Sequence, residues 1–155
     1  MELAYRVLDI SELDHVVALE QKLLAGLQIP EHDAMVMAWH APWRRESLEH
    51  YLPKGWCFGA WRKTSGSEEL AGYFLAQPLI FFRGYTQTLW VEHLAAADEN
   101  VKLELIELAR RYGRDKHLQS VLFADNQDLR AALTQSGGQK IGDSIIEFRT
   151  TKVRT

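Results

Sequence analysis

The sequence predicts one α/β domain, residues 1–155, in which helices flank a mixed and mostly antiparallel sheet. Three observations lead to this prediction. A length of 155 residues suits a single domain. Stretches in which apolar residues alternate come between stretches of helical periodicity. Read along the chain, the order β-α-α-β-β-β-α-β-α-β needs one crossover connection, through the helix after the fourth strand.

The chain is predicted to open with a short strand around Tyr5 and Val7, followed by a helix. Ser11 offers an N-cap hydroxyl, and Asp14 supplies an acid three residues later. We therefore expect the first helix to begin at Ser11 and to fade at Gly26.

Residues 29–43 and 45–52 form the next part of the chain. Residues 45–52 fit a short helix that Pro53 ends. Residues 29–43 have no clean period and form either a buried irregular connection or a lid that faces a substrate. Of the two, we favour the buried connection.

From Gly55 onwards the apolar period changes to two. Residues 56–62 and 70–78 are predicted to pair as an antiparallel hairpin through a polar turn at 64–67, and residues 86–95 form a third strand. A helix then follows whose apolar face includes Val101, Leu105, Leu108, Ala109 and Tyr112. Its expected stop is Gly113.

The last part of the chain is predicted to add a strand, a helix and a closing strand. Residues 120–124 are a short apolar run of the kind found in buried strands. Asn126 can cap a helix that Gly137 ends. Residues 140–149 alternate and suit a closing antiparallel strand.

Composition excludes several classes of function. With 46% hydrophobic and 25% charged residues the chain is a folded domain, and its net charge of -3 and lack of a basic stripe give no nucleic-acid partner. No segment approaches the ~20 apolar residues of a membrane span, and no signal peptide is recognisable, so we expect a cytoplasmic protein. The single cysteine, Cys57, is expected to be a buried inert thiol, and no metal site is predicted.

Three phrases carry a resemblance to a known family: Glu69-Leu70-Ala71-Gly72-Tyr73-Phe74, Trp90-Val91-Glu92-His93-Leu94, and Asn126 followed by a short helix and Gly137. With the element order, they make the chain resemble the GNAT superfamily of acetyl-CoA-dependent N-acyltransferases. The resemblance spans nearly the whole chain. It implies the GNAT fold, an acyl-CoA co-substrate and an amine acceptor, either a small molecule or a peptide.

Two positions depart from the family pattern. The loop that would bind the pyrophosphate of coenzyme A reads Ala95-Ala96-Ala97-Asp98-Glu99-Asn100, without the family's glycines and arginine. Asp98 and Glu99 are good capping residues at a helix N-terminus, but they repel a pyrophosphate by about 1 kcal/mol per charge pair in water. Leu133 stands where many family members carry a proton-donating tyrosine. We therefore expect acetyl-CoA to bind weakly or not at all.

Acyl transfer to an amine requires a base, and Glu92 is the first candidate. Strand periodicity predicts that Glu92 shares a face with Trp90 and Leu94, and that His93, the second candidate, points to the opposite face. The alternative is that Glu92 is a solvated or paired strand residue and His93 a satisfied one.

The resemblance also implies where acyl-CoA binds. The backbone groups of Leu94, Ala95 and Ala96 would pair with the pantetheine arm, with Asn126 nearby, although we favour Asn126 as a simple N-cap. Tyr85 and Trp43 are predicted to form an aromatic wall for the acceptor. The aromatic residues of 81–85 either bind the acceptor or a second subunit, or complete the core.

Two functions of different class thus remain. The first is an N-acyltransferase in which Glu92 activates the amine for direct attack on the thioester. The second is a non-catalytic binding or regulatory module that has lost the coenzyme A loop and dimerises through its aromatic surfaces.

Overall fold

The computed structural model describes residues 2–82, 85–124 and 126–140 of the chain. Within them the strands form one sheet in the order β1-β2-β3-β4-β5, antiparallel except for the parallel pair β4 and β5. This confirms the predicted mixed α/β layout, and the crossover runs through α4. The predicted strand at 140–149 lies, beyond Lys140, outside the described residues. The strands are β1 Leu3–Val7, β2 Phe58–Thr64, β3 Ser67–Phe82, β4 Tyr85–Ala96 and β5 Ser120–Phe123.

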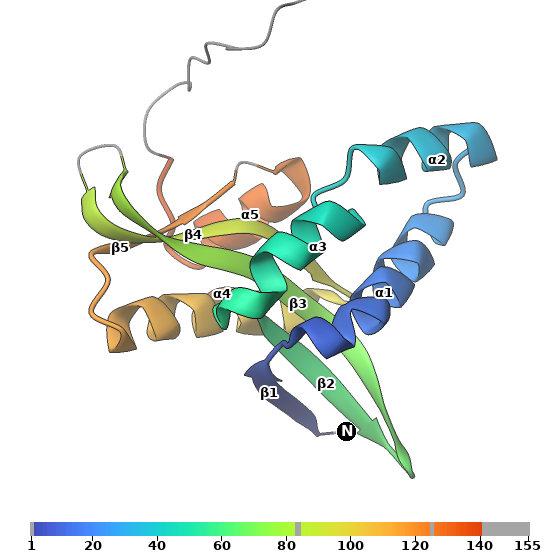
Figure 1. Ribbon diagram of the computed structural model, residues 1–155, viewed down its shortest axis with the longest axis horizontal. Helices are drawn as coiled ribbons and strands as arrows, with labels where there is room; N and C mark the ends of the chain where they lie inside the picture. Colours follow the sequence, from blue (N-terminus) through green and yellow to red (C-terminus); the bar gives the residue numbers. More distant parts are fainter. Residues whose placement is uncertain (1, 83–84, 125, 141–155) are drawn as a thin grey trace, which may run out of the picture.

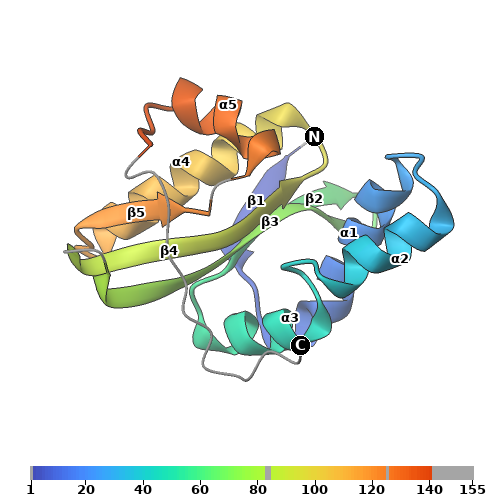
Figure 2. The ribbon, with the colours of Figure 1, turned by 90° about the horizontal axis from the view of Figure 1, so that it is seen from above.

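Helices cover both faces of the sheet (Figures 1 and 2). On one face lie α1 and α3, and on the other lie α4 and α5. The helix α2 connects α1 to α3 and stands out from the body of the molecule. The bounds are α1 Leu13–Ala25, α2 Glu31–Trp39, α3 Arg45–Tyr51, α4 Glu99–Asp115 and α5 Gln127–Gln135, with short 3₁₀ turns at Ile10–Glu12 and Leu52–Lys54.

Each face of the sheet has its own hydrophobic core. Under α4 and α5, Phe74 and Leu105 are fully buried. Under α1 and α3, Leu48 and Tyr73 are fully buried. Because side chains alternate along β3, Phe74 belongs to one core and Tyr73 to the other. A residue's core therefore shows which face of the sheet it occupies.

The predicted cap of the first helix is wrong by two residues. Asp9, not Ser11, caps the opening turn: its carboxylate accepts the Ser11 backbone N–H at 2.9 Å, and Glu12 accepts the Asp9 N–H at 3.1 Å. This reciprocal pair is a capping box around a 3₁₀ turn, and α1 begins only at Leu13. The sequence offered two acceptors close together, and the earlier one starts the turn.

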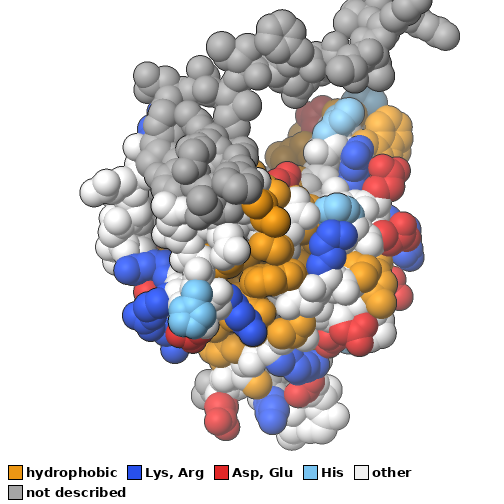
Figure 3. Space-filling model, turned by 60° about the vertical axis from the view of Figure 1, so that its left-hand side comes forward, with side chains coloured by type: hydrophobic (Ala, Val, Ile, Leu, Met, Phe, Trp, Pro, Cys, Tyr) orange, Lys and Arg blue, Asp and Glu red, His pale blue; other side chains and the backbone are white. Residues whose placement is uncertain are grey.

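Residues 29–43 are not the buried irregular connection that we favoured. Most of this segment is the regular helix α2, which buries no residue. Its large apolar side chains are exposed, with 49% of Met35, 49% of Met37 and 65% of Trp39 accessible. Figure 3 shows the molecule from a different side, where apolar side chains form a strip on the surface between charged groups.

Gly113 is not the expected helix stop but lies buried inside α4, where the helix presses against β5. A Cβ added at Gly113 would lie 2.5 Å from Cγ2 of Val121. Only glycine permits this close approach.

We therefore predict that Gly113→Ala destabilises the protein. Alanine is intrinsically better than glycine in a helix by about 1 kcal/mol, but overpacking costs about 1–3 kcal/mol and should win at a 2.5 Å contact. Urea unfolding is expected to show a lower midpoint. Adding Val121→Ala should recover part of the loss, and equal stability of Gly113→Ala and the parent would contradict the steric account.

Candidate active site at the end of strand β4

The central feature of the site is a bulge in β4. Opposite β3, Leu75 pairs with His93 and Ala76 pairs with Val91, so Glu92 is an extra residue without a partner. A β-bulge redirects the side chains of its strand and is frequent beside active sites.

The bulge overturns the predicted faces of Glu92 and His93. Leu94 packs in the core under α4 and α5, whereas His93 contacts Tyr73 of the opposite core. Glu92 contacts Tyr51, which also belongs to that opposite core. Strict alternation had placed Glu92 with Leu94 and apart from His93. The extra residue instead puts both candidate bases on the face covered by α1 and α3.

Two neutral donors hold the carboxylate of Glu92. The Trp90 indole Nε1–H donates to Glu92 Oε2 at 2.6 Å. The Tyr51 hydroxyl, from α3, is also hydrogen-bonded to Glu92. Burial, and then the neighbouring Glu92 charge, raise the pKa of Tyr51 to about 12, so its hydroxyl stays protonated at neutral pH. With two oxygens, the carboxylate keeps lone pairs for another donor.

His93 is held by a different acid. Its Nε2 lies 2.7 Å from Oε1 of Glu20 on α1, and the Tyr73 hydroxyl donates to the same oxygen at 2.6 Å. Glu20 is only 6% exposed. Nothing in the sequence singled out Glu20. It lies on the apolar side of α1, and its partner His93 is 73 residues further along the chain.

The pairing of strands β4 and β5 ends immediately beside Glu92, where β5 itself ends. Their parallel pairing runs from Thr88 with Ser120 to Val91 with Phe123, and ends with a bond from Ala124 N–H to Val91 O at 3.0 Å. Among the described residues, the β5 side of β4 has no strand partner from Glu92 to Ala96. This open edge includes Leu94, Ala95 and Ala96, to which pantetheine contacts were assigned.

The N-terminus of α4 lies directly after the open edge. Asp98 caps it, accepting the Val101 backbone N–H at 2.9 Å, which agrees with the capping role predicted from the sequence. Asp98 also pairs with Arg62 of β2 at 3.1 Å. Lys102 lies 3.1 Å from Glu99 and 3.5 Å from a backbone carbonyl of α5. Residues 95–100 contain no cation, but the fold places Arg62 and Lys102 beside this turn.

Comparisons with known proteins bear on the fold. The sequence matches no protein-family model, and no curated protein matches it. Among solved structures, a GCN5-related N-acetyltransferase from Ralstonia eutropha shares 12% identity, with a TM-score of 0.66 over 95% of this chain and 99% of its own. An aminoglycoside N-acetyltransferase in complex with CoA shares 15%, with a TM-score of 0.66 over 97% and 96%. A predicted acetyltransferase with acetyl-CoA from Clostridium acetobutylicum shares 10%, with a TM-score of 0.67 over 96% and 96%.

The chain has the GNAT fold. The resemblance inferred from the element order and the three phrases is therefore confirmed at the level of the fold. The identities of 10 to 15% with these structures establish no more than that.

Two further residues with predicted roles lie at the start of α5 and within it. Asn126 is the N-cap of α5 and accepts the Asp128 N–H at 2.8 Å, as the simpler interpretation expected. Leu133 is half-buried on α5 and packs against the core under α4.

The proposed aromatic wall can be placed only in part. Trp43 is half-buried and packs against the core under α1 and α3, which is the face that Glu92 occupies. Tyr85 begins β4, but its side chain lies outside the described residues. The pairing of Trp43 with Tyr85 at an acceptor site therefore stays a prediction.

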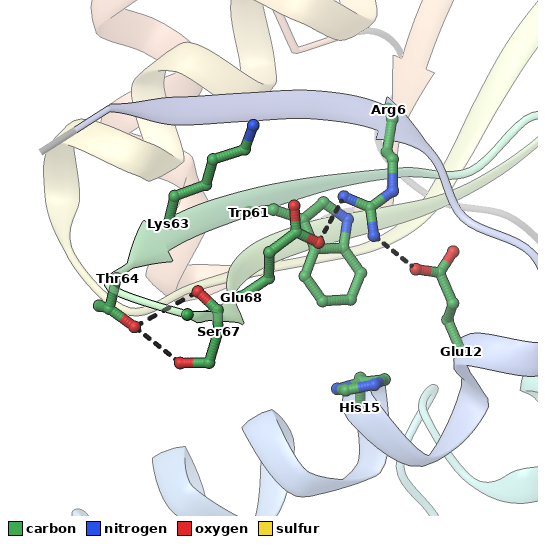
Figure 4. Close-up of a pocket in the computed structure, with 9 residues that line it drawn as sticks. Arg6, Glu12, His15, Trp61, Lys63, Thr64, Ser67 and Glu68 are labelled. Carbon is green, nitrogen blue, oxygen red and sulfur yellow. Dashed lines mark hydrogen bonds and ion pairs between the residues drawn. The ribbon is translucent and has the colours of Figure 1, made fainter.

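A surface pocket lies elsewhere on the GNAT fold (Figure 4). It is lined by residues of β1, the β2–β3 hairpin and α1, on the far side of β3 from the open edge of β4. Arg6 stacks over the Trp61 ring at 4.2 Å and is held by Glu12 and Glu68 at 3.0 and 3.2 Å. Because Arg6, Glu12 and Glu68 already pair with one another, we do not place the function there.

Cys57 is fully buried, as predicted, with Sγ 3.6 Å from the Tyr51 carbonyl oxygen. Burial raises the pKa of this thiol to about 11, so it is not a nucleophile. Across the described ranges, no group of three His, Cys, Asp or Glu residues could hold a metal ion. The helices seen in those same ranges are too short or too polar to cross a membrane.

Proposed function

We propose that this protein is an N-acyltransferase that moves an acyl group from acyl-CoA to an amine. The observation that carries the proposal is the end of β4–β5 pairing at Val91, directly beside Glu92. A carboxylate therefore stands next to an open strand edge on a GNAT fold. Acyl transfer needs this combination of a base and a groove for the thioester.

In the proposed reaction, Glu92 removes a proton from the acceptor ammonium so that the neutral amine can attack the thioester carbonyl. Trp90 and Tyr51 fix the carboxylate by donating to it, and they leave lone pairs for the ammonium. Acyl-CoA supplies the activated acyl group. The acceptor is a small-molecule or peptide amine, and the carboxylate favours one that is protonated in solution.

The open edge of β4 suits the amide-containing pantetheine arm. An extended chain can add to a strand edge through main-chain hydrogen bonds, as peptides do in β-augmentation. The backbone groups of Leu94, Ala95 and Ala96 would make these bonds. The pyrophosphate fits less well, because Asp98 already occupies the first turn of α4.

The direct test is to measure release of free thiol from acetyl-CoA with a panel of primary amines and N-terminal peptides. Mass spectrometry of the protein as purified would show whether it carries coenzyme A or acetyl-CoA. Amine-dependent thiol release together with an acylated product supports the proposal. If the panel gives no product and acetyl-CoA does not bind, the proposal is wrong.

A second function, a non-catalytic module that uses the same scaffold, is favoured by one observation. The Asp98 carboxylate accepts a backbone N–H at the α4 N-terminus and pairs with Arg62, so this anion site is already engaged by the protein's own acid. A module of this kind would bind a partner, such as a second copy, without turning over acyl-CoA. The thiol-release assay distinguishes the two functions.

We predict weak binding of acetyl-CoA by the parent protein and tighter binding by Asp98→Asn. Asparagine still caps a helix, so the fold is retained, while one charge that repels the pyrophosphate is removed. A gain of about 1 kcal/mol corresponds to roughly fivefold higher affinity. Isothermal titration calorimetry measures the effect.

The matched control is Asp115→Asn at the other end of α4, where the acid is exposed. This variant is expected to bind acetyl-CoA like the parent. Micromolar or tighter binding by the parent itself would show that Asp98 does not hinder the cofactor.

A further inference from the structure

The described part of the chain buries two polar or charged side chains, and Glu20 is the charged one. Glu20 is 6% exposed and lies between α1 and the sheet, among residues of the core that contains Leu19 and Tyr73. Removing a carboxylate from water costs several kcal/mol unless charged and hydrogen-bonding partners compensate. An apolar side chain would pack at this helix–sheet interface without that cost in free energy. The partners of Glu20 therefore indicate its role.

The partners of Glu20 converge on one oxygen. His93 Nε2 lies 2.7 Å from Oε1, and the Tyr73 hydroxyl lies 2.6 Å from the same atom. Burial, and then the charge of Glu20, hold the pKa of Tyr73 well above its usual range, so Tyr73 remains a hydrogen-bond donor. The acid is thus fixed in place by Tyr73 and directed at the imidazole.

We propose that Glu20 is a positioning residue that holds His93 as a second proton carrier in acyl transfer. This inference rests on the proposed function, and it adds a residue from α1 to the site. His93 adjoins Glu92 across the bulge and shares its face of the sheet.

The orientation of the ring follows from the bond to Glu20. When Nε2–H donates to the carboxylate, the neutral imidazole carries its lone pair on Nδ1. No hydrogen bond from Nδ1 to another described residue is present. A carboxylate behind an imidazole fixes the tautomer and stabilises the imidazolium that forms when the ring takes up a proton.

Two adjacent carriers match the proton balance of the reaction. The acceptor ammonium loses one proton to Glu92 before the C–N bond forms, and Glu92 later releases that proton to solvent. The nitrogen loses its second proton to His93 after attack. As the C–S bond breaks, the departing sulfur takes the electron pair, and His93 returns this proton to it. The products are an amide, a free thiol and one proton in solution.

The experiment compares Glu20→Gln with Glu69→Gln. Glutamine at position 20 keeps the shape but replaces the carboxylate by an uncharged amide, which can donate as well as accept and so no longer dictates which imidazole nitrogen of His93 carries the proton. Glu69 of β3 pairs with Lys22 of α1 at 2.9 Å, so it also links α1 to the sheet. That pair is exposed, and Glu69 is six residues along β3 from Leu75, the partner of His93. We expect Glu20→Gln to lower kcat at least tenfold with little change in KM, and Glu69→Gln to leave both unchanged.

A spectroscopic measurement separates positioning from mere stability, and it needs no substrate. Imidazole ¹⁵N chemical shifts are expected to show a fixed Nε2–H tautomer for His93 in the parent and in Glu69→Gln, but not in Glu20→Gln. His93→Gln identifies the signal. Glu20→Gln in the His93→Gln background should cause no further loss of kcat, because both changes act through one group.

The outcomes are distinct. Parent turnover with unchanged kcat in Glu20→Gln would overturn the role of Glu20 and leave the proposed function intact. Absence of turnover by the parent with every amine would remove both. If Glu20→Gln fails to fold, Glu20→Asp keeps the charge on a shorter side chain. Full kcat in Glu20→Asp, with the His93 tautomer no longer fixed, would then count against the role.

Discussion

Replacement of Glu92 by glutamine is expected to lower kcat for acyl transfer by about a hundredfold or more. Glutamine has nearly the same shape, and its carbonyl oxygen can still accept from Trp90 and Tyr51, so the strand and its bulge should persist. It cannot take up a proton. The change should therefore affect turnover much more than folding, and rates of thiol release at saturating acetyl-CoA and amine measure it.

The control for Glu92→Gln is Glu107→Gln on the exposed side of α4. Glu107 pairs with Arg110 at 3.1 Å, away from the site, and this variant should turn over like the parent. Were Glu92→Gln to keep full turnover across pH, Glu92 would not be the base, and His93 would become the first candidate.

The largest expected effect on stability is that of Leu48→Ala. Leu48 is fully buried and anchors α3, which carries Tyr51 to Glu92. Truncation of a buried leucine to alanine costs about 2–5 kcal/mol. Because α3 has only seven residues, loss of this anchor should also loosen the helix locally and lower kcat below the unfolding transition. Urea unfolding and thiol release at low temperature measure the two effects.

Leu129→Ala is the matched substitution on the other face of the sheet. Leu129 is 4% exposed on α5, and its truncation should cost a similar free energy of unfolding. Because Leu129 packs in the core under α4 and α5, whereas Leu48 and Tyr51 pack in the core under α1 and α3, kcat should fall less than in Leu48→Ala. Equal losses of kcat in the two variants would indicate that α3 has no special connection to the site.

Much of the fold could be predicted because the signals were local. The hairpin around residues 64–67 and the amphipathic face of α4 follow from apolar period and turn chemistry alone. Gly113 was misread because its requirement is tertiary: the need for glycine arises from Val121, which belongs to another element. The helix α2 was misread because it buries nothing and so leaves no amphipathic pattern.

The candidate site was predictable in position but not in arrangement. Glu92 and His93 could be named as candidate bases because they are titratable residues on the strand that the resemblance singled out. That they share a face could not be predicted, because a bulge shifts the alternation by one residue. No glycine in this part of β4 marks the bulge in the sequence. Glu20 and Tyr51 were missed for a related reason. Each reaches the strand from a helix far along the chain, and sequence spacing carries no record of that contact.

The buried thiol described above has a practical consequence. Cys57 is the sole cysteine, is inaccessible in the native state and has a pKa of about 11. Alkylating reagents can therefore reach it only when the chain opens, and the rate of labelling reports that opening. Alkylation of Cys57 can therefore serve to measure how often the protein opens at the junction of α3 with the sheet.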